Sequence, residues 1–242
     1  MKSNDLISVV LANYNGASFV GDAISSVIAQ TDRKFELILI DDCSTDESDQ
    51  ICEEFVSKFP ELITYLRHEK NLGQSAGFNS GFKKAKGEVV CFLDSDDVWF
   101  PNKLSRVREV FGKNEGIGLV QHNMEILNNS TVSGRHIRPY LISGDLLAFW
   151  QENGQRPNLM PTSGLAYPRY VLEEIFPIPE TIRICSDAYL ARAAFLHGKV
   201  CSVMENLGYY RVHGANNTFE NISHKGGIYY TDVVQPELQK YY

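Results

Sequence analysis

Short apolar runs alternate with stretches of helical length over the first 110 residues of the chain. Each apolar run is expected to form a buried strand, and the segment that follows it carries apolar residues at helical spacing. The expected strands cover residues 7–12, 35–40, 62–66 and 88–93, and the expected helices include residues 18–30, 51–56, 75–86 and 101–111. The spacing of Ser44 and Glu47 predicts a capping box for the second helix. This alternation predicts an α/β fold with a mostly parallel central sheet flanked by helices.

The alternation becomes irregular after Gly116. The elements expected there are a strand at 117–127, a short helix at 144–150, a loop-and-strand region at 156–168, a helix at 187–197 and a strand at 199–210. No change of composition marks a linker between the two parts. We therefore expect a single domain over 1–242, made of a regular half (1–115), an irregular half (116–215) and a polar tail (216–242).

The composition excludes several classes of protein. The formal net charge of −7 argues against a broadly basic surface, so no nucleic-acid partner is expected. No run of about 20 apolar residues is present to form a membrane span. The five cysteines are scattered and include no C-x-x-C pair, which fits a reducing, cytoplasmic environment.

Acidic residues follow two of the expected strands. Asp41 and Asp42 come after the second strand, and Asp94 and Asp96 come after the fourth in D-x-D spacing. The ends of parallel strands converge at one edge of the sheet, where such folds bind ligands. A carboxylate pair of this kind suits Mg²⁺ or Mn²⁺, with substrate phosphates and water as further ligands. The alternative is that these aspartates only cap a helix or solvate a turn.

Several motifs, in this order and spacing, together point to one family. They are Ser8–Asn15, Asp41–Asp46, Asn71–Asn79, Lys86–Glu88, Leu93–Asp97 and Tyr209–Asn217. The set resembles the family 2 glycosyltransferases of GT-A fold. That resemblance implies a Rossmann-like sheet, a nucleotide-sugar donor bound by the 1–115 half, and an acceptor side and catalytic base in the 116–215 half. It further implies Mn²⁺ or Mg²⁺ as cofactor and, as in most members, inversion at the anomeric carbon.

The resemblance assigns roles to residues of the first half. Ala12 and Tyr14 would line the nucleobase pocket, with the Tyr14 ring available for stacking. Asp42 would accept a hydrogen bond from the base. Asp94 would hold the ribose or a metal-bound water, and Asp96 would ligate the metal that bridges the diphosphate.

Two further assignments fall in the second half. His213 would add a metal or phosphate contact, although a histidine in this position is commonly a hydrogen-bonded structural residue. Asp187 matches the position of the family's catalytic base, with Ser186 where many members have Glu. Since Asp187 begins an expected helix, it is equally placed to act as a capping residue.

One segment departs from the family pattern. Many members carry Ala-Arg-Asn where this chain has Gly77, Phe78 and Asn79. A donor-contacting arginine is therefore absent, which affects the expected nucleotide and sugar preference more than the reaction class.

Other functions fit the sequence less well. Residues 94–98 match the D-x-D-x-V pattern of aspartate phosphatases, but that motif normally lies on the first strand. A dehydrogenase lacks support because no G-x-G-x-x-G follows the first strand. A non-catalytic nucleotide-sugar-binding module of the same fold is the main alternative, and the presence of Asp42, Asp96 and Asp187 together favours the enzyme.

The resemblance also suggests a setting. We expect transfer from a UDP-sugar to a saccharide or lipid-linked saccharide, in bacterial polysaccharide or glycolipid assembly. A lipid-linked acceptor would bring a cytoplasmic enzyme to the inner membrane face as a peripheral protein.

Overall fold

The computed structural model describes residues 5–128, 130–155, 157–214 and 236. The first half contains β1 (Ile7–Asn13), α1 (Val20–Ile28), β2 (Phe35–Asp41), α2 (Ser48–Lys58), β3 (Ile63–Arg67), α3 (Gln74–Lys84), β4 (Val89–Asp94), β5 (Val98–Trp99) and α4 (Lys103–Lys113). The second half contains β6 (Ile117–Asn128), β7 (Thr131–His136), α5 (Leu146–Asn153), a 3-10 turn at Thr162–Gly164, β8 (Leu165–Pro168), α6 (Arg169–Ile175), α7 (Ser186–Ala194) and β9 (Lys199–Val212). Apart from residue 236, the 216–242 tail lies outside the described residues.

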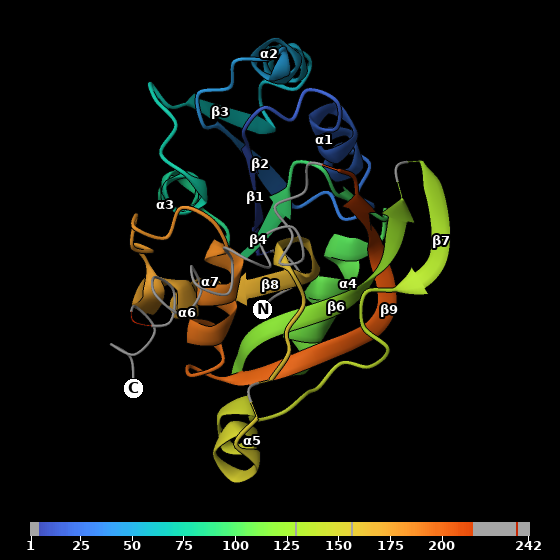
Figure 1. The fold of residues 1–242 in the computed structure, drawn as a ribbon, viewed down its shortest axis with the longest axis vertical. Helices are drawn as coiled ribbons and strands as arrows, with labels where there is room; N and C mark the ends of the chain where they lie inside the picture. Colours follow the sequence, from blue (N-terminus) through green and yellow to red (C-terminus); the bar gives the residue numbers. More distant parts are fainter. Residues whose placement is uncertain (1–4, 129, 156, 215–235, 237–242) are drawn as a thin grey trace.

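All the strands belong to one curled sheet in the order β3-β2-β1-β4-β8-β6-β9-β5, with β7 paired to β6 (Figure 1). Strands β3, β2, β1 and β4 are parallel, as the repeated strand–helix alternation predicts. Strand β8 runs antiparallel to both β4 and β6, whereas β6 and β9 are parallel. The predicted α/β fold is confirmed, and the parallel half continues into a mixed half.

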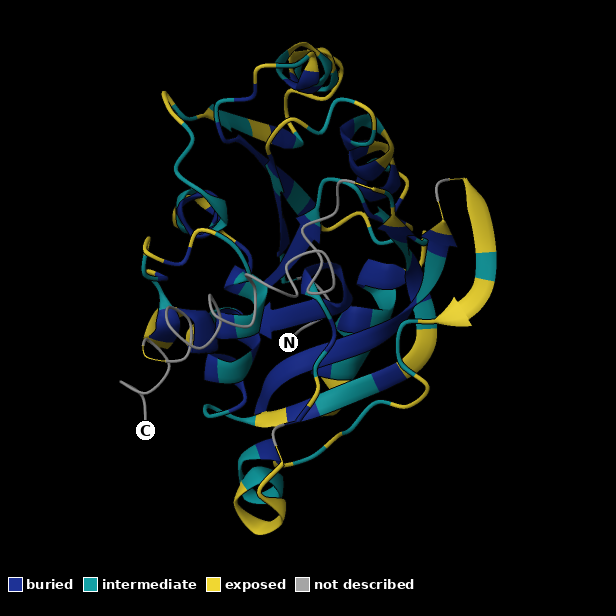
Figure 2. Cartoon of the chain, in the orientation of Figure 1, coloured by how far each residue is buried: buried dark blue, intermediate teal, exposed yellow. Residues whose placement is uncertain are grey.

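Helices cover both faces of the sheet. Successive residues of β1 point to opposite faces, so Val10 joins one hydrophobic cluster while Val9 and Leu11 join the other. The cluster that contains Val10 packs against α3, α6 and α7, and the other packs against α1, α2 and α4. Figure 2 shows the central strands as the most continuously buried part of the chain. Each fully buried aliphatic side chain contributes about 1.5–3 kcal/mol.

Helix α3 approaches β1 through two glycines. A Cβ added to Gly77 would lie 3.2 Å from the Cβ of Ala12, and one added to Gly81 would overlap the side chain of Val10. The absence of side chains at these two positions lets the helix lie close to the strand that leads into the site.

Three elements and one cap differ from the sequence-based expectation. Strands β5 and β7 and helix α6 were not expected, because β5 has two residues, β7 is mostly exposed, and α6 directly follows Pro168. The capping-box prediction is wrong: α2 begins at Ser48 with Glu47 as N-cap, and the hydroxyl of Ser44 instead donates to Asp41.

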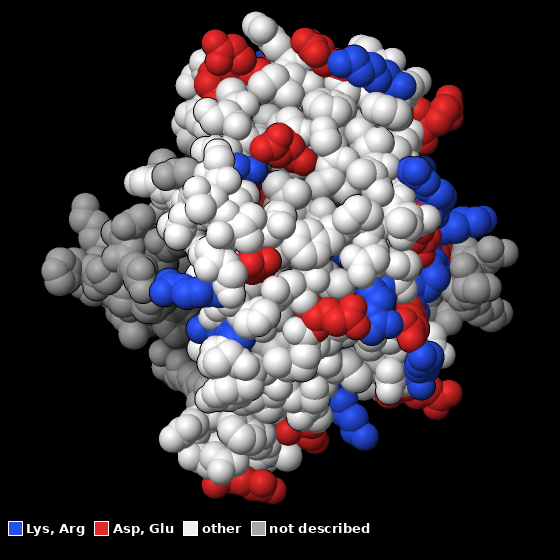
Figure 3. Space-filling view, turned by 90° about the vertical axis from the view of Figure 1, so that its right-hand side faces the viewer, with Lys and Arg blue, Asp and Glu red and all other residues white. Residues whose placement is uncertain are grey.

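One face of the molecule carries charges of both signs (Figure 3). On the face shown in Figure 3, the described Lys and Arg side chains are interspersed with Asp and Glu. Among the described residues, none of the helices is both long and apolar enough to cross a bilayer.

Candidate functional site

The carboxyl ends of β1, β2 and β4 lie side by side at one edge of the sheet. Asn13 of β1 is opposite Asp41 of β2, and Ala12 of β1 is opposite Asp94 of β4. The loops that follow these strands therefore begin next to one another. The structure brings together the acidic segments that were predicted from sequence to lie at one edge of the sheet, which we call the rim.

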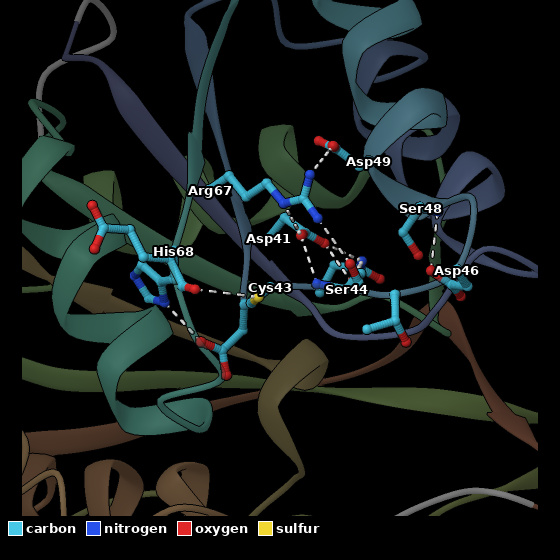
Figure 4. A network of polar contacts seen from close by, with 12 residues as sticks. Asp41, Cys43, Ser44, Asp46, Ser48, Asp49, Arg67 and His68 are labelled. Carbon is cyan, nitrogen blue, oxygen red and sulfur yellow. Dashed lines mark hydrogen bonds and ion pairs between the residues drawn. The ribbon is translucent and has the colours of Figure 1, made fainter.

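Asp41 is a buried structural residue of this rim (Figure 4). Its carboxylate accepts hydrogen bonds from Asn13 Nδ2 at 3.0 Å and from the backbone N–H of Ser44 at 2.9 Å. The guanidinium of Arg67 lies 3.4 Å from the same carboxylate and also pairs with Asp49 of α2. These contacts fix the turn after β2 and leave Asp42, the next residue, to face the neighbouring loop.

Asp42 holds the loop that leads into α3. It is only 5% exposed, and its carboxylate accepts from the backbone N–H groups of Leu72 at 2.9 Å and Gly73 at 2.7 Å. His68 Nδ1 lies 2.7 Å from the same carboxylate, and His68 Nε2 lies 2.8 Å from Ser80 Oγ. His68 is therefore a hydrogen-bonded structural residue of this loop. A nucleobase contact by Asp42 would share a carboxylate that already orders the loop.

The two other predicted nucleobase residues lie at the end of β1. Ala12 is partly buried against Gly77, and Tyr14 is 50% exposed, so its ring is accessible for stacking. Phe78, at the position of the missing arginine, is fully buried with its ring 4.5 Å from that of Phe92. That position therefore contributes to the core rather than to the rim.

Three non-glycine residues in loops of this region adopt the left-handed conformation. Asn15, Cys43 and Cys185 have φ values of 52°, 64° and 59°, respectively. Such conformations are uncommon for residues with a Cβ and concentrate at functional sites. They lie after β1, after β2 and directly before α7.

Four carboxyl groups crowd the rim after β4. Burial raises the pKa of Asp94 well above its usual range, and the nearby charges of Asp96 and Asp187 raise it further. Burial, with Asp96 and Asp94 next in effect, does the same to the pKa of Asp97. Burial also raises the pKa of Asp187. The cluster concentrates acidic groups at one place, an environment that suits a cation or a proton.

The end of β9 meets the D-x-D loop. His213 Nε2 lies 3.1 Å from Asp96 Oδ2, and its ring packs 4.4 Å from the ring of Phe19. Arg211 donates from Nε to the backbone carbonyl of Asp96 at 2.8 Å, and its backbone N–H donates to Asp97 Oδ1 at 2.9 Å. Phe19 carried no signal in the sequence beyond its place among the apolar residues of the first expected helix. Asn216 and Asn217 of the motif lie outside the described residues.

Asp187 lies in the first turn of α7, close enough to Asp94 to raise its pKa. The N-cap of this helix is Cys185, which makes no side-chain capping bond. Backbone N–H groups of Ala188 and Thr162 donate to the Asp187 carboxylate and lower its pKa, opposing the larger effect of burial. Thr162 also hydrogen-bonds Asp94 through its side chain, so it contacts both acids, a role that its place in an expected loop gave no means of predicting.

The residues present fit a divalent cation. Asp96 and His213 offer a carboxylate oxygen and an imidazole nitrogen in direct contact, and Asp94 and Asp97 lie close enough to Asp96 for its charge to raise their pKa. Within the described ranges, no group of three or more His, Cys, Asp or Glu side chains is arranged to hold a metal alone. This donor set matches a Mn²⁺ or Mg²⁺ site that takes further ligands from substrate phosphates and water.

Comparison with known proteins gives consistent matches. The family model described as glycosyl transferase family 2 matches residues 8–176. An uncharacterized glycosyltransferase of Nostoc sp. is 42% identical over 214 residues, 87% of this chain and 66% of the relative. The Escherichia coli protein WfgD, named UDP-Glc:alpha-D-GlcNAc-diphosphoundecaprenol beta-1,3-glucosyltransferase, is 34% identical over 138 residues, 57% of this chain and 53% of the relative. The matched regions thus cover roughly half to two thirds of these relatives' length.

Solved structures share the fold. S. aureus TarS 1-349 in complex with UDP superposes with a TM-score of 0.69 at 22% identity, over 86% of this chain and 60% of that one. The mannosyltransferase PcManGT of Pyrobaculum calidifontis, in complex with GDP-Man and Mn²⁺, gives a TM-score of 0.67 at 16% identity, over 88% of this chain and 59% of that one. The predicted GT-A fold is confirmed by these matches.

Proposed function

Since the chain belongs to glycosyl transferase family 2, we propose that it transfers a sugar from a nucleoside-diphosphate donor, a UDP-sugar, to a hydroxyl acceptor with inversion. The acceptor class is a saccharide or lipid-linked saccharide of bacterial polysaccharide or glycolipid assembly. The observation that carries the proposal is the meeting of the Asp96–His213 pair with Asp94 and Asp187 at one rim. A relative named as a glucosyltransferase acting on a diphosphoundecaprenol-linked sugar supports the acceptor class, and a lipid-linked acceptor would place the chain at the cytoplasmic membrane face.

The donor half of the rim would hold the nucleotide. The half-exposed ring of Tyr14 is available to stack on the base, and Ala12 and the carboxylate of Asp42 would line the same pocket. Asp94 would hydrogen-bond the ribose or a metal-bound water. Asp96 and His213 would hold Mn²⁺ or Mg²⁺, which when bound supplies positive charge to the diphosphate leaving group.

Asp187 would accept the proton of the attacking hydroxyl. Because burial raises its pKa, this carboxylate is a stronger base than an exposed aspartate, and a positioned base typically contributes about 10²–10⁴-fold to the rate. A single displacement at the anomeric carbon needs no protein nucleophile. The acceptor oxygen would attack the anomeric carbon on the face opposite the diphosphate, so that its bond to this carbon forms as the bond to the diphosphate breaks and its proton passes to Asp187. Attack from that face gives the product the inverted configuration.

Calorimetric titration with UDP, GDP, CDP and dTDP, each with and without Mn²⁺, tests the proposal. We expect metal-dependent binding of UDP that Asp96→Ala abolishes and that Glu54→Gln, an exposed substitution on α2, leaves unchanged. UDP binding combined with no sugar transfer to any acceptor would indicate the non-catalytic module. Failure of every nucleotide to bind in the presence of metal would refute the donor site itself.

A further inference from the structure

We propose that Gln74 is a positioning residue, an inference that rests on the proposed function. Its side chain holds the proposed base Asp187 in place relative to the predicted donor-binding carboxylates. Gln74 is the first residue of α3, and its side-chain Oε1 accepts from the backbone N–H of Ser186 at 2.9 Å. Ser186 is the first residue of α7 and directly precedes Asp187. The two contacting residues are 112 positions apart in the chain.

The Ser186 N–H needs a partner from outside its own helix. The first N–H groups of an α-helix have no intrahelical acceptor, and Cys185, the N-cap of α7, makes no side-chain capping bond. Gln74 provides the missing acceptor from α3. The backbone next to Asp187 is therefore fixed by a side chain of the donor half.

Further bonds hold the same two segments together. The N–H of Gln74 donates to the carbonyl of Arg183 at 2.9 Å, and the buried hydroxyls of Ser75 and Ser186 lie 2.8 Å apart. The Arg183 guanidinium donates to the carbonyl of Leu72 at 3.0 Å. Several neighbouring bonds of this kind leave little freedom for the start of α7 to shift relative to α3.

The other end of this connection lies on the donor-site acids. The N–H groups of Leu72 and Gly73 bond to Asp42, and the Gln74 side chain donates to Asp94. One short loop therefore contacts two predicted donor-binding carboxylates and the helix of the base. This arrangement is what separates Gln74 from a residue that only stabilises the fold.

The consequence is a selective loss of turnover when the amide is removed. Misplacement of a reacting group by about 1 Å costs up to about 10²-fold in rate. We expect Gln74→Leu to lower kcat by about 10-fold to 100-fold, while the donor KM changes less than about twofold. Gln74→Glu keeps an acceptor oxygen for Ser186 but replaces the amide that donates to Asp94 with a carboxylate, so it is expected to keep slow amide exchange at Ser186 while its kcat falls below that of the parent.

Asn79→Leu is the matched control. Asn79 is also an amide on α3, and it exchanges two 2.8 Å hydrogen bonds with the backbone of Ile178, away from the start of α7. The same amide-to-leucine change should lower the melting temperature but leave kcat equal to that of the parent. A merely structural role for Gln74 predicts that the two leucine variants behave alike in both measurements.

The rate of nucleotide release from a UDP-sugar, with water or an acceptor, gives kcat and KM. Amide hydrogen exchange over residues 183–190, measured without substrate, reports on the hydrogen bond between Ser186 and Gln74. Gln74→Leu should speed exchange at Ser186, whereas Asn79→Leu should not. Parent-like kcat in Gln74→Leu, or exchange at Ser186 that is as fast in Gln74→Glu as in Gln74→Leu, would overturn the inference. If the parent releases no nucleotide, the proposed function fails, and unchanged exchange at Ser186 in Gln74→Leu would then independently refute this hydrogen bond.

Discussion

At the residue scale, the buried position of Asp94 lowers the stability of the folded protein when its carboxyl group is charged. Its folded-state pKa lies above the ordinary value of 3.8 because of burial and then the charges of Asp96 and Asp187. At low pH the carboxyl group is protonated and costs no stability. Stability is lost as the pH rises through the raised pKa, because the folded protein must then hold a disfavoured charge. Each pKa unit corresponds to about 1.4 kcal/mol.

We therefore expect Asp94→Asn to raise the melting temperature at pH 7, with the gain shrinking toward pH 4, where the parent carboxyl is protonated. Thermal unfolding of both proteins between pH 4 and pH 8 measures this. Glu54→Gln removes an exposed carboxylate and should show no such trend. A lower melting temperature for Asp94→Asn at pH 7 would mean that its bonds to Thr162 and Gln74 outweigh the charge repulsion.

Asp187 and Asp96 should separate chemistry from binding. Asp187→Asn is expected to lower kcat by about 10²–10⁴-fold and to leave UDP affinity unchanged, because the carboxylate would act only on the acceptor hydroxyl. The rate of the parent should fall as the pH drops through the raised pKa of Asp187, since the base must be unprotonated. That acid limb should be missing in Asp187→Asn. Loss of UDP binding in this variant would place Asp187 in the donor site instead.

At the element scale, the close approach of α3 to β1 positions the strand that leads into the site. A methyl group on Gly81 would overlap Val10, so Gly81→Ala should lower the free energy of unfolding by about 1–3 kcal/mol. Gly21 of α1 has only ordinary contacts around an added Cβ, so Gly21→Ala should gain stability instead. Denaturant unfolding of the single variants and of the Val10→Ala double variant measures this. The double variant should lose less than the sum of the singles, and simple additivity would contradict the overlap.

The strands and helices around β1, β2 and β4 were predictable because long apolar runs and helical spacing are local signals. Strand direction is not local: β8 runs antiparallel between β4 and β6 because of partners far away in the chain. Strand β5 depends in the same way on its pairing with β9. The unexpected elements are those whose existence or orientation is decided by tertiary contacts.

The same distinction applies to the site. The convergence of Asp42 and Asp94 follows from parallel strands ending at one edge, so pattern alone predicted it. The family resemblance gave Asp96 and His213 separate metal or phosphate roles, but their direct contact was not predicted. Gln74 and Thr162 carry no motif-level signal, because their partners lie on elements whose packing the sequence does not display.

At the scale of the whole molecule, the order of the strands in the sheet brings residues from both halves of the chain to the rim. Strand β8 pairs with β4, so the 3-10 turn before it brings Thr162 next to Asp94 and Asp187. Strand β9 then carries His213 to Asp96 from the other side. Residues of the irregular half thus complete a site that the parallel half begins.

A ligand that neutralises this rim should stabilise the entire domain. Saturation to about 100 times the dissociation constant adds about 2.7 kcal/mol, or roughly 5–10 °C for a chain of this size. Because Asp96 and the diphosphate would both be neutralised by the same cation, we expect UDP with Mn²⁺ to raise the melting temperature by more than the sum of their separate effects. Differential scanning fluorimetry of the parent and Asp96→Ala tests this, and the variant should lose the excess. Strictly additive shifts in the parent would contradict a metal bridging the carboxylate and the nucleotide, since independent sites stabilise independently.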